Sequence, residues 1–316
     1  MITSQESSTN RQQPLANDAI IKVITPGLFS SVQGLGLSGY RHLGIPFGGA
    51  LDRQALILGN RILGNPDSTP ALELTSGQVE LKFTRDAWFV LTGAQYRIAI
   101  DGRDIWHSWR NKIKAGEILT LRGPKSAMRA YLAVDGGIQP TQQNTTLQIT
   151  KQLAKGDCLR LGSALSIAKP IGAVQRGYSN EIRALPGPEM SLFTPQSRKA
   201  FWSNAWQLTN NSNRMGARLA GEILSLTKPQ ELNSHAVMPG VVQVPPSGQP
   251  IVLLADAQTT GGYPKMATVI EADLWKVAQT RPGSTVRFIH VSPGQADDAN
   301  YEWQQYFYRL QRAIDA

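Results

Sequence analysis

The segment from Ala255 to Lys265, which reads Ala-Asp-Ala-Gln-Thr-Thr-Gly-Gly-Tyr-Pro-Lys, is the most unusual one in the chain for its chemistry. Its adjacent glycines permit positive φ angles and a close approach of the backbone to a ligand. Lys265 supplies a compact positive charge that suits a phosphate or a carboxylate. The amide and hydroxyl side chains can both donate and accept hydrogen bonds, as an amide substrate needs. The segment therefore predicts a ligand-binding loop, with a polar hairpin turn as the alternative.

Two other segments carry groups that suit the same ligand. The stretch from Asn213 to Arg218 places two arginines around a glycine, and arginines grip anions well. A solvent-facing turn is the alternative for this stretch. Gln243 lies in a short β-branched run bounded by prolines, from Pro239 to Pro246, and we expect it on a strand that could converge on the loop.

In the N-terminal half, Glu73 follows an apolar pair, Ala71-Leu72. A carboxylate at this place could orient a substrate amide or serve as a base. An ordinary ion-paired glutamate is the alternative. Further from these segments, the four histidines are dispersed and none has the H-E-x-x-H spacing of a zinc site, so no metal site is predicted; they are His42, His107, His235 and His290.

Three nucleotide or hydrolase motifs are absent or incomplete. Gly34 to Gly39 matches G-x-G-x-x-G, but the residues up to Pro46 cannot open the long helix that a dinucleotide fold requires, so a turn-rich loop is predicted. Gly123 to Ser126 resembles part of a phosphate-binding loop, but a proline precedes its lysine. The serine-hydrolase sequence G-x-S-x-G does not occur.

Short β-branched and aromatic runs, separated by turns, must position these groups. Asp101-Gly102 between two such runs is a strong signal for a two-residue hairpin. The predicted strands are 19–24, 29–33, 79–83, 88–92, 96–100, 117–121, 128–134, 206–209, 251–255, 267–270 and 285–291. Many short strands with few helices between them favour β-barrels or sandwiches.

Four helices are predicted. Asp52 can cap the first, whose apolar stripe from Ala55 to Leu63 ends at Gly64. Thr194 caps the second, with Pro195 at its first position. A short helix spans 273–279, and an apolar stripe through Trp303, Phe307, Leu310 and Ile314 predicts a docked C-terminal helix.

Composition narrows the class of protein. The 316 residues are 41% hydrophobic, which supports substantial cores, and the longest apolar runs are far shorter than the roughly 20 residues of a membrane span. The net charge of +9 comes from scattered residues, which favours a small anionic substrate or an acidic partner over nucleic acid.

A single cysteine, Cys158, excludes an internal disulfide. The polar segment 1–18 has no apolar core of a secretory signal and is predicted to be disordered.

Several motifs, in this order, resemble one known family. The N-terminal part of the signature is 25–29, 32–33, 39–46, 50–53, 60–66 and 71–75. The C-terminal part is 185–189, 214–216, 243–246 and 258–265, and its last motif, Gln-Thr-Thr-Gly-Gly-Tyr-Pro-Lys, is highly specific. The resemblance is to the biotin-dependent carboxyltransferase-like family, which includes the C subunit of bacterial 5-oxoprolinase, the KipA-type proteins and part of urea carboxylase.

The resemblance implies a mainly β fold with two cyclophilin-like β-barrel domains, a few short helices and a C-terminal helix. The expected division is a disordered segment 1–18, an N-terminal domain 19–165, a linker 166–180, a C-terminal domain 181–292 and a helix 293–316. The resemblance also implies a cytoplasmic enzyme component that opens 5-oxoproline to glutamate with ATP and Mg. It would do so only together with two partners, the A-type and the KipI-like B-type subunits.

From the motifs and the resemblance together, two sets of site residues are predicted. The catalytic set is Lys265, Glu73 and Arg214, with Lys265 and Arg214 stabilising the charge that develops on a phosphate. The substrate-binding set is His42, Gln243, Asp256, Gln258, Thr259, Thr260, Gly261, Gly262 and Tyr263.

Two alternatives stay open. The first is carboxyl transfer to a urea-like amide, which needs a separate biotin carrier because the chain has no biotin-acceptor Met-Lys pair. The second is a KipA-type regulatory module that binds a kinase-inhibitor partner. Departures from the family pattern, such as Gly34 after Gln33 and Ala257 before Gln258, leave open a diverged member of lower activity.

Overall fold

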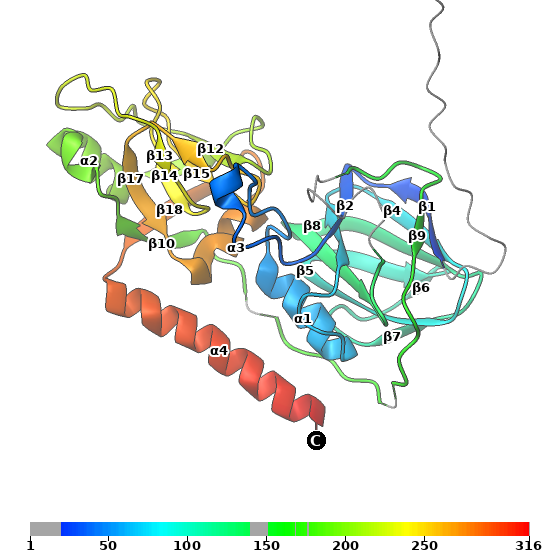
Figure 1. Cartoon of the computed structure of the whole chain (residues 1–316). Helices are drawn as coiled ribbons and strands as arrows, with labels where there is room; N and C mark the ends of the chain where they lie inside the picture. Colours follow the sequence, from blue (N-terminus) through cyan, green and yellow to red (C-terminus); the bar gives the residue numbers. More distant parts are fainter. Residues whose placement is uncertain (1–19, 140–150, 168, 176, 316) are drawn as a thin grey trace, which may run out of the picture.

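The computed structural model describes residues 20–139, 151–167, 169–175 and 177–315, so the segment predicted to be disordered, 1–18, lies outside the described residues. Two β-rich bodies lie side by side, with a long C-terminal helix along one edge of both (Figure 1). We call the body built on strands β1 to β9 the N-lobe and the body built on β10 to β18 the C-lobe. The exact domain limits and the linker at 166–180 stay a prediction.

The N-lobe is a nine-stranded sheet in which β8 is the central strand. Its first half pairs with β4, its second half with β3, and β5 follows it along most of its length. Along the main path of the sheet, neighbouring strands follow the order β2-β3-β8-β4-β1-β9. The strands are β1 (Ile20–Pro26), β2 (Phe29–Gln33), β3 (Ala71–Thr75), β4 (Val79–Phe83), β5 (Ala87–Ile100), β6 (Arg103–Asp104), β7 (Asn111–Ile113), β8 (Ile118–Val134) and β9 (Cys158–Arg160).

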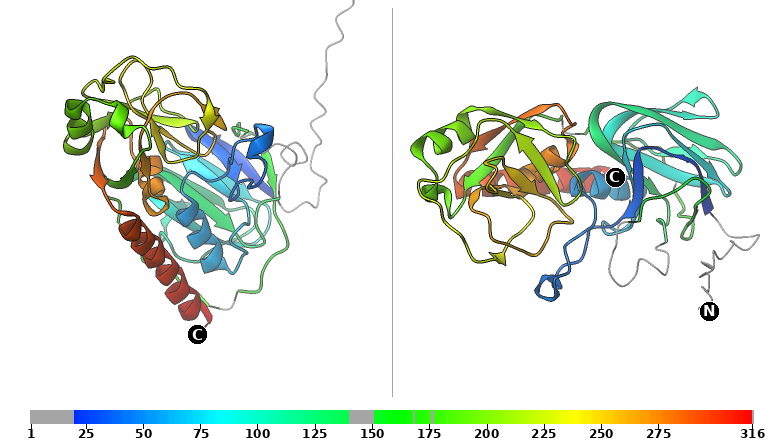
Figure 2. Two further views of the ribbon diagram at one scale, coloured as in Figure 1. Left: turned by 60° about the vertical axis from the view of Figure 1, so that its left-hand side comes forward. Right: turned by 90° about the horizontal axis from the view of Figure 1, so that it is seen from above.

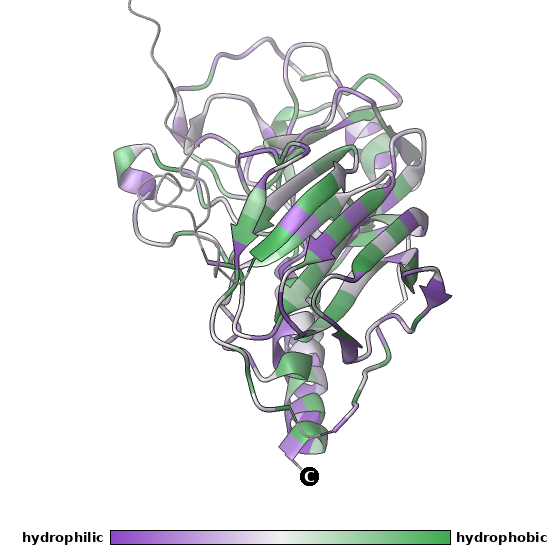
Figure 3. Ribbon diagram, turned by 90° about the vertical axis from the view of Figure 1, so that its right-hand side faces the viewer, coloured by the Kyte–Doolittle hydropathy of each residue, from purple (hydrophilic) through white to green (hydrophobic). Residues whose placement is uncertain are grey.

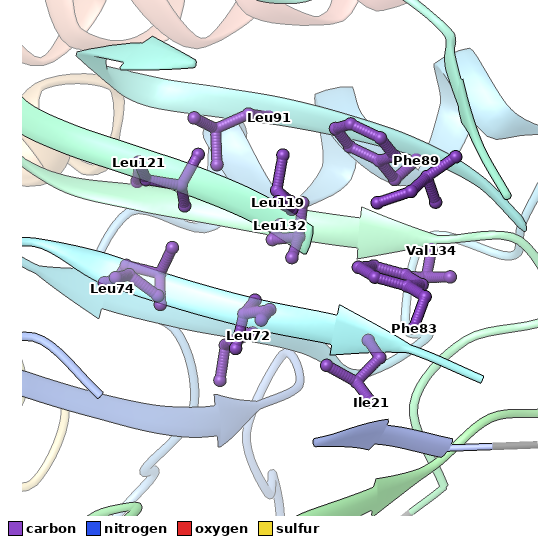
Figure 4. Packing of buried hydrophobic residues seen from close by; sticks show 14 of the residues in the cluster. Ile21, Leu72, Leu74, Phe83, Phe89, Leu91, Leu119, Leu121, Leu132 and Val134 are labelled. Atoms are coloured by element: carbon purple, nitrogen blue, oxygen red, sulfur yellow. The ribbon is translucent and has the colours of Figure 1, made fainter. Parts of the chain in front are cut away.

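Because β8 pairs with β4 along its first half and with β3 along its second half, the sheet curls, and its apolar face lies inside the curl. Side chains from several strands, among them Leu72, Phe83, Phe89 and Leu132, meet inside the curl (Figure 4). On the outside, polar and apolar residues alternate along the strands (Figure 3), as expected for strands with one wet face. The core is therefore built from the period-two pattern of the sequence.

The N-lobe strands are longer than the sequence predicted. The runs 88–92 and 96–100 are one strand, β5, and the runs 117–121 and 128–134 are one strand, β8. The pairing of β5 with β8 shifts register between Gly93 and Gln95 and again before Arg97, so irregularities interrupt the pattern without ending the strands. The Asp101-Gly102 hairpin is confirmed, with φ angles of 44° and 82° at the two residues.

The C-lobe is a closed barrel in the order β10-β17-β14-β15-β12-β11-β18, and the ring closes through parallel pairing of β10 with β18. A separate two-stranded sheet joins β13 to β16. The strands are β10 (Glu181–Pro186), β11 (Ala205–Leu208), β12 (Gly216–Ala220), β13 (His235–Ala236), β14 (Val241–Gln243), β15 (Ile251–Leu253), β16 (Thr260–Gly261), β17 (Lys265–Val269) and β18 (Thr285–His290). The predicted mainly β fold is confirmed, with one closed barrel and one curled sheet.

The predicted helices are present. Asp52 caps α1 (Arg53–Leu63) and Gly64 ends it in a left-handed conformation, while Thr194 caps α2 (Pro195–Ser203). Helix α3 (Glu271–Gln279) begins two residues earlier than predicted. The C-terminal helix α4 (Pro293–Asp315) buries Phe307 and Leu310 in one apolar cluster with α1. The described residues also include the short 3-10 turns η1 (Arg41–Leu43) and η3 (Met190–Leu192).

The segment 34–50, which we call the strap, leaves the N-lobe and lies against the C-lobe (Figure 2). It contains η1 and no longer helix, so the loop interpretation of Gly34 to Gly39 is confirmed. The Gly48 amide donates to the carbonyl of Ala255 over 2.9 Å, which fixes the strap at the start of the predicted ligand loop. Among the described residues, no helix has the length and apolarity needed to cross a membrane.

Candidate functional site

A buried polar network joins the two lobes, and Glu73 lies at its centre. Glu73 is on β3 with no exposed surface. One carboxylate oxygen accepts hydrogen bonds from the Leu51 amide at 3.0 Å and from the Tyr131 hydroxyl at 2.7 Å. The other oxygen accepts from Nη1 of Arg214, a C-lobe residue, at 2.6 Å. The predicted Glu73 is therefore an ion-paired group whose partner comes from the far half of the chain.

The Arg214 guanidinium is held on several sides. Its Nε and Nη2 donate to the Asp256 carboxylate at 2.8 and 3.0 Å, and Nη2 also donates to the Gly49 carbonyl at 2.5 Å. Burial alone would lower the pKa of Arg214, but the charges of Glu73 and Asp256 outweigh it and raise that pKa above its ordinary value. The structure thus brings Glu73, Arg214 and Asp256 together, and the guanidinium positions two carboxylates.

Asp52 and Tyr131 extend this network beyond the predicted set. The Tyr131 hydroxyl, which donates to Glu73, also accepts from the Asp52 amide at 2.7 Å. The Asp52 carboxylate caps α1 by accepting from the Ala55 amide at 2.9 Å, and it accepts from Nε2 of Gln279 at 2.7 Å. The sequence predicts Asp52 only as a helix cap, because its other partners are far away in the chain.

Gln279, at the end of α3, ties the C-lobe to β8 of the N-lobe. Its side-chain oxygen accepts from the amides of Met128 and Arg129 at 3.0 and 2.8 Å. Its side-chain nitrogen donates to the Arg129 carbonyl at 2.8 Å, in addition to Asp52. Each hydrogen-bonding atom of this carboxamide is thus used at the contact between the lobes.

Burial raises the pKa of Asp52 to about 6, from an ordinary value of 3.8, although Gln279 and Ala55 stabilise the charged form. The folded protein therefore holds this proton more tightly than the unfolded chain, and the stability that Asp52 contributes is lost as the pH rises from about 4 to about 6. For Asp52→Asn, we expect the unfolding free energy, relative to the unsubstituted protein, to rise by about 3 kcal/mol between pH 4 and pH 7. Urea unfolding at several pH values measures this difference, and a constant difference would contradict it.

A second cluster surrounds Lys265, at the start of β17. Lys265 is only 7% exposed. Its Nζ contacts a Glu189 carboxylate oxygen at 2.9 Å, and its amide donates to the other oxygen at 3.1 Å. Nζ also contacts Nε2 of His235, whose Nδ1 lies 2.9 Å from the Asn233 carbonyl. Lys265 is therefore a largely buried cation held between a carboxylate and an imidazole.

Sequence reasoning missed two members of this cluster, Glu189 and His235. Glu189 ends one of the motifs of the family signature, so its position in that motif was an available signal. The sequence alone favours a structural role for His235, and no local pattern marks it as a site residue. It reaches Lys265 only because β13 pairs with β16, which places His235 opposite Gly261.

The two glycines of the predicted ligand loop leave room for neighbouring groups that a side chain would crowd. They do not serve an unusual backbone conformation, since neither has a positive φ. A Cβ atom on Gly261 would lie 2.8 Å from Nε2 of Gln243, and one on Gly262 would lie 2.8 Å from the Leu232 carbonyl. The Gln243 side chain also donates to the Tyr263 carbonyl at 3.4 Å. The prediction that Gln243 lies on a strand next to this loop is confirmed, since it ends β14.

The outer part of the loop is open. Gln258 and Thr260 are exposed, as is Tyr263 at 45%, and Thr259 is half-buried. Arg41 of the strap donates to the Thr259 carbonyl at 3.4 Å and also contacts the Val237 carbonyl. His42, the next residue, is exposed on η1, and its predicted role in substrate binding stays a prediction. It is Arg41 that joins the strap to the loop.

Comparison with known proteins agrees with this arrangement. Residues 43–290 match the family model described as carboxyltransferase domain, subdomain A and B. The chain is 45% identical to the 5-oxoprolinase C subunit of Escherichia coli over 302 residues, which covers 92% of this chain and 97% of that protein. It is 41% identical to the 5-oxoprolinase C subunit of Haemophilus influenzae over 296 residues, covering 90% of this chain and 96% of that protein.

More distant relatives carry the same fold inside longer chains. The urea amidolyase of Saccharomyces cerevisiae is 28% identical over 305 residues, which are 86% of this chain but 17% of that protein. The crystal structure of the Kluyveromyces lactis urea amidolyase superposes with a TM-score of 0.82 at 26% identity, over 92% of this chain and 20% of that one. The curled N-lobe, the closed C-lobe barrel and the sequence motifs agree with these matches, and the chain belongs to the carboxyltransferase domain family of subdomains A and B.

Proposed function

We propose that this chain is the C subunit of a 5-oxoprolinase, which opens 5-oxo-L-proline to L-glutamate. The observation that carries the proposal is the 45% identity to a 5-oxoprolinase C subunit over 97% of that protein. The length of the match matters because it includes both lobes, and hence both halves of the buried network.

The chemistry of the substrate supports a role for ATP. A lactam is an unreactive amide, and transfer of a phosphoryl group from ATP to its oxygen, with release of ADP, makes its carbonyl carbon more electrophilic. Addition of water to that carbon is then followed by cleavage of the C–N bond, which opens the ring, and hydrolysis of the resulting acyl phosphate releases phosphate. In this proposal Lys265 stabilises the charge that develops on the phosphate, as a preorganised cation in a partly dry site. Arg214 and Glu73 act as positioning residues, because each is occupied by the other and by Asp256, Leu51 or Tyr131.

Partners follow from the same proposal. The chain works in a cytoplasmic complex with the A-type and the KipI-like B-type subunits, and ATP with Mg is a co-substrate of the complex. The exposed side of the Gln258 to Tyr263 loop supports a site that is completed by another chain, since sites often form where subunits meet. Biotin is not attached to this chain in this proposal.

Glutamate release tests the proposal. The chain is co-expressed with A-type and B-type partners, and 5-oxoproline and ATP are supplied. Glutamate should form only when all three proteins and ATP are present, and omission of this chain is the control. A stable, co-purified assembly that forms no glutamate would contradict the proposal.

A second candidate is carboxyl transfer to a urea-like amide, which the likeness to urea amidolyase favours. That reaction would require bicarbonate and a separate biotinylated carrier, so adding both to the same assembly separates the two activities. A KipA-type regulatory module would show neither glutamate release nor carboxyl transfer, and would only bind its B-type partner.

A further inference from the structure

His235 contacts Lys265 but is not one of the residues that the proposed function uses. It lies beside the ligand loop, because β13 pairs with β16 and places His235 opposite Gly261. The His235 side chain is 41% exposed, whereas the Lys265 side chain is 9% exposed. The imidazole is therefore open to protons from solvent, although the ammonium group that it contacts is nearly enclosed.

The two ring nitrogens of His235 have partners that define its protonation state. Nδ1 lies 2.9 Å from the Asn233 carbonyl, an oxygen that can only accept, so Nδ1 carries a hydrogen. Nε2 contacts Nζ of Lys265, an ammonium group that can only donate, so Nε2 carries a lone pair. Both contacts are hydrogen bonds only if the imidazole is neutral and has its hydrogen on Nδ1.

Two acceptors on different elements hold the Lys265 ammonium group. An ammonium group has three N–H donors. Among the described residues, one donor is used by Glu189 at 2.9 Å and a second by Nε2 of His235. Nζ cannot shift without lengthening one of these bonds, so the third N–H has a fixed direction. With Glu189 alone, Nζ could swing about the carboxylate. A donor fixed in advance is what stabilises charge that develops on a ligand.

Charged side chains from three elements reach this part of the C-lobe. Lys265 is on β17, Glu189 precedes η3 with one oxygen 3.9 Å from Nε2, and Arg41 of the strap contacts the Val237 carbonyl. Protonation of His235 would replace the lone pair on Nε2 by an N–H that faces the Lys265 ammonium group. Lys265 would lose an acceptor and gain a neighbour of like charge, so it would no longer be held in one place.

We propose that His235 is a positioning residue for Lys265. Its neutral form accepts a hydrogen bond from Lys265 and directs the third N–H of the ammonium group toward an anionic oxygen of the ligand. When His235 takes up a proton, Lys265 is released from this position. The proposal deepens the proposed function and rests on it for the phosphorylated lactam as the ligand.

Nitrogen NMR of the histidine side chains in the full-length chain tests the contact without turnover. The His235 signals are identified by their absence in His235→Gln. At about pH 8 they should show a hydrogen on Nδ1 and none on Nε2. Lys265→Ala should shift the Nε2 signal more than Lys199→Ala, a variant on α2, does. A hydrogen on Nε2, or equal shifts in the two variants, would overturn the inference.

Kinetics of the complete assembly test the positioning. Glutamine keeps an acceptor near the place of Nε2 but takes up no proton, so His235→Gln should keep kcat within about tenfold at about pH 8. His235→Ala should lower kcat about tenfold to a hundredfold with little change in KM, because a misplaced donor loses transition-state stabilisation. As the pH falls from about 8 to about 5, the ratio of kcat in His235→Gln to kcat in the unsubstituted assembly should rise at least about threefold.

Two controls separate this effect from general ones. In a Lys265→Ala background, His235→Ala should add less than about threefold to the loss of kcat, since His235 acts through Lys265. His290→Gln, the same substitution at an exposed histidine on β18, should leave kcat and its pH dependence unchanged. Other groups that titrate in this range, Asp52 among them, are common to both members of the ratio and cancel.

Each other kinetic outcome overturns the inference: a His235→Gln as slow as His235→Ala, full activity of His235→Ala, or a ratio that stays constant with pH. An assembly that forms no glutamate contradicts the proposed function instead, and the NMR measurement then still decides whether His235 holds Lys265.

Discussion

Replacing Arg214 by alanine should destabilise the protein by about 3–5 kcal/mol and lower the glutamate-forming activity at least about a hundredfold. The stability cost arises because Glu73, with no exposed surface, keeps its negative charge but loses its partner at 2.6 Å. The loss of activity is expected because Arg214 fixes Asp256 at the start of the ligand loop, and a displacement of about 1 Å can cost about a hundredfold in rate. Urea unfolding and glutamate release measure the two effects.

A double-mutant cycle distinguishes the loss of the Glu73–Arg214 ion pair from a general loss of stability. Glu73→Gln removes the charge that Arg214 neutralises, so the double variant should be less destabilised than the sum of the single variants, by about 1–3 kcal/mol. Arg218, the second arginine of the 213–218 stretch, is exposed on β12, which agrees with the solvent-facing alternative for it. Arg218→Ala is therefore the matched control and should change little. If Arg214→Ala were as stable and as active as Arg218→Ala, the network would have no role.

Replacing Lys265 by alanine should reduce kcat for 5-oxoproline by about a hundredfold to a thousandfold, the usual effect of removing one group that stabilises developing charge. Lys265→Arg should stay within about tenfold of the unsubstituted protein, because arginine keeps the charge and can bond to Glu189. Steady-state kinetics of the assembled enzyme measure both variants.

The controls for Lys265 concern folding and assembly. Each variant should co-purify with its partners as the unsubstituted chain does, and Lys199→Ala, on α2 and away from the Lys265 cluster, should keep full activity. Near-normal kcat in Lys265→Ala would refute the role of this cation. An inactive Lys265→Arg with intact assembly would show that the shape of the lysine, and not its charge, is what the site needs.

Features that depend on neighbouring residues were predictable from the sequence. The cap at Asp52, the left-handed end at Gly64 and the Asp101-Gly102 hairpin each follow from side chains a few residues apart, and all are confirmed. The apolar stripe of α4 was predictable for the same reason. The lengths of β5 and β8 were not, since local irregularities interrupt the pattern of a strand that long-range pairing keeps intact.

The site could be predicted only in part, because its contacts join distant positions. Glu73 and Arg214 were identified separately, but 141 residues separate them, and nothing local indicates that they pair. Asp52 and Gln279 are 227 residues apart, so a cap in one lobe and a helix end in the other gave no sign of a shared hydrogen bond. The adjacent glycines were the signal for the predicted ligand loop, whose binding role stays a prediction. Their structural role differs from the expected one, because they make room for Gln243 and Leu232 instead of adopting positive φ.

The network between the lobes has a consequence for how such chains can be recombined. Glu73, Tyr131 and Asp52 come from the first half, while their partners Arg214 and Gln279 come from the second. A hybrid that joins the first half of this chain to the second half of a relative keeps Glu73 neutralised only if the relative supplies an arginine at position 214, and keeps the hydrogen bond to Asp52 only if it supplies a donor at position 279. The two halves, although each has its own apolar core, therefore depend on each other for the buried polar network and are not expected to be interchangeable modules.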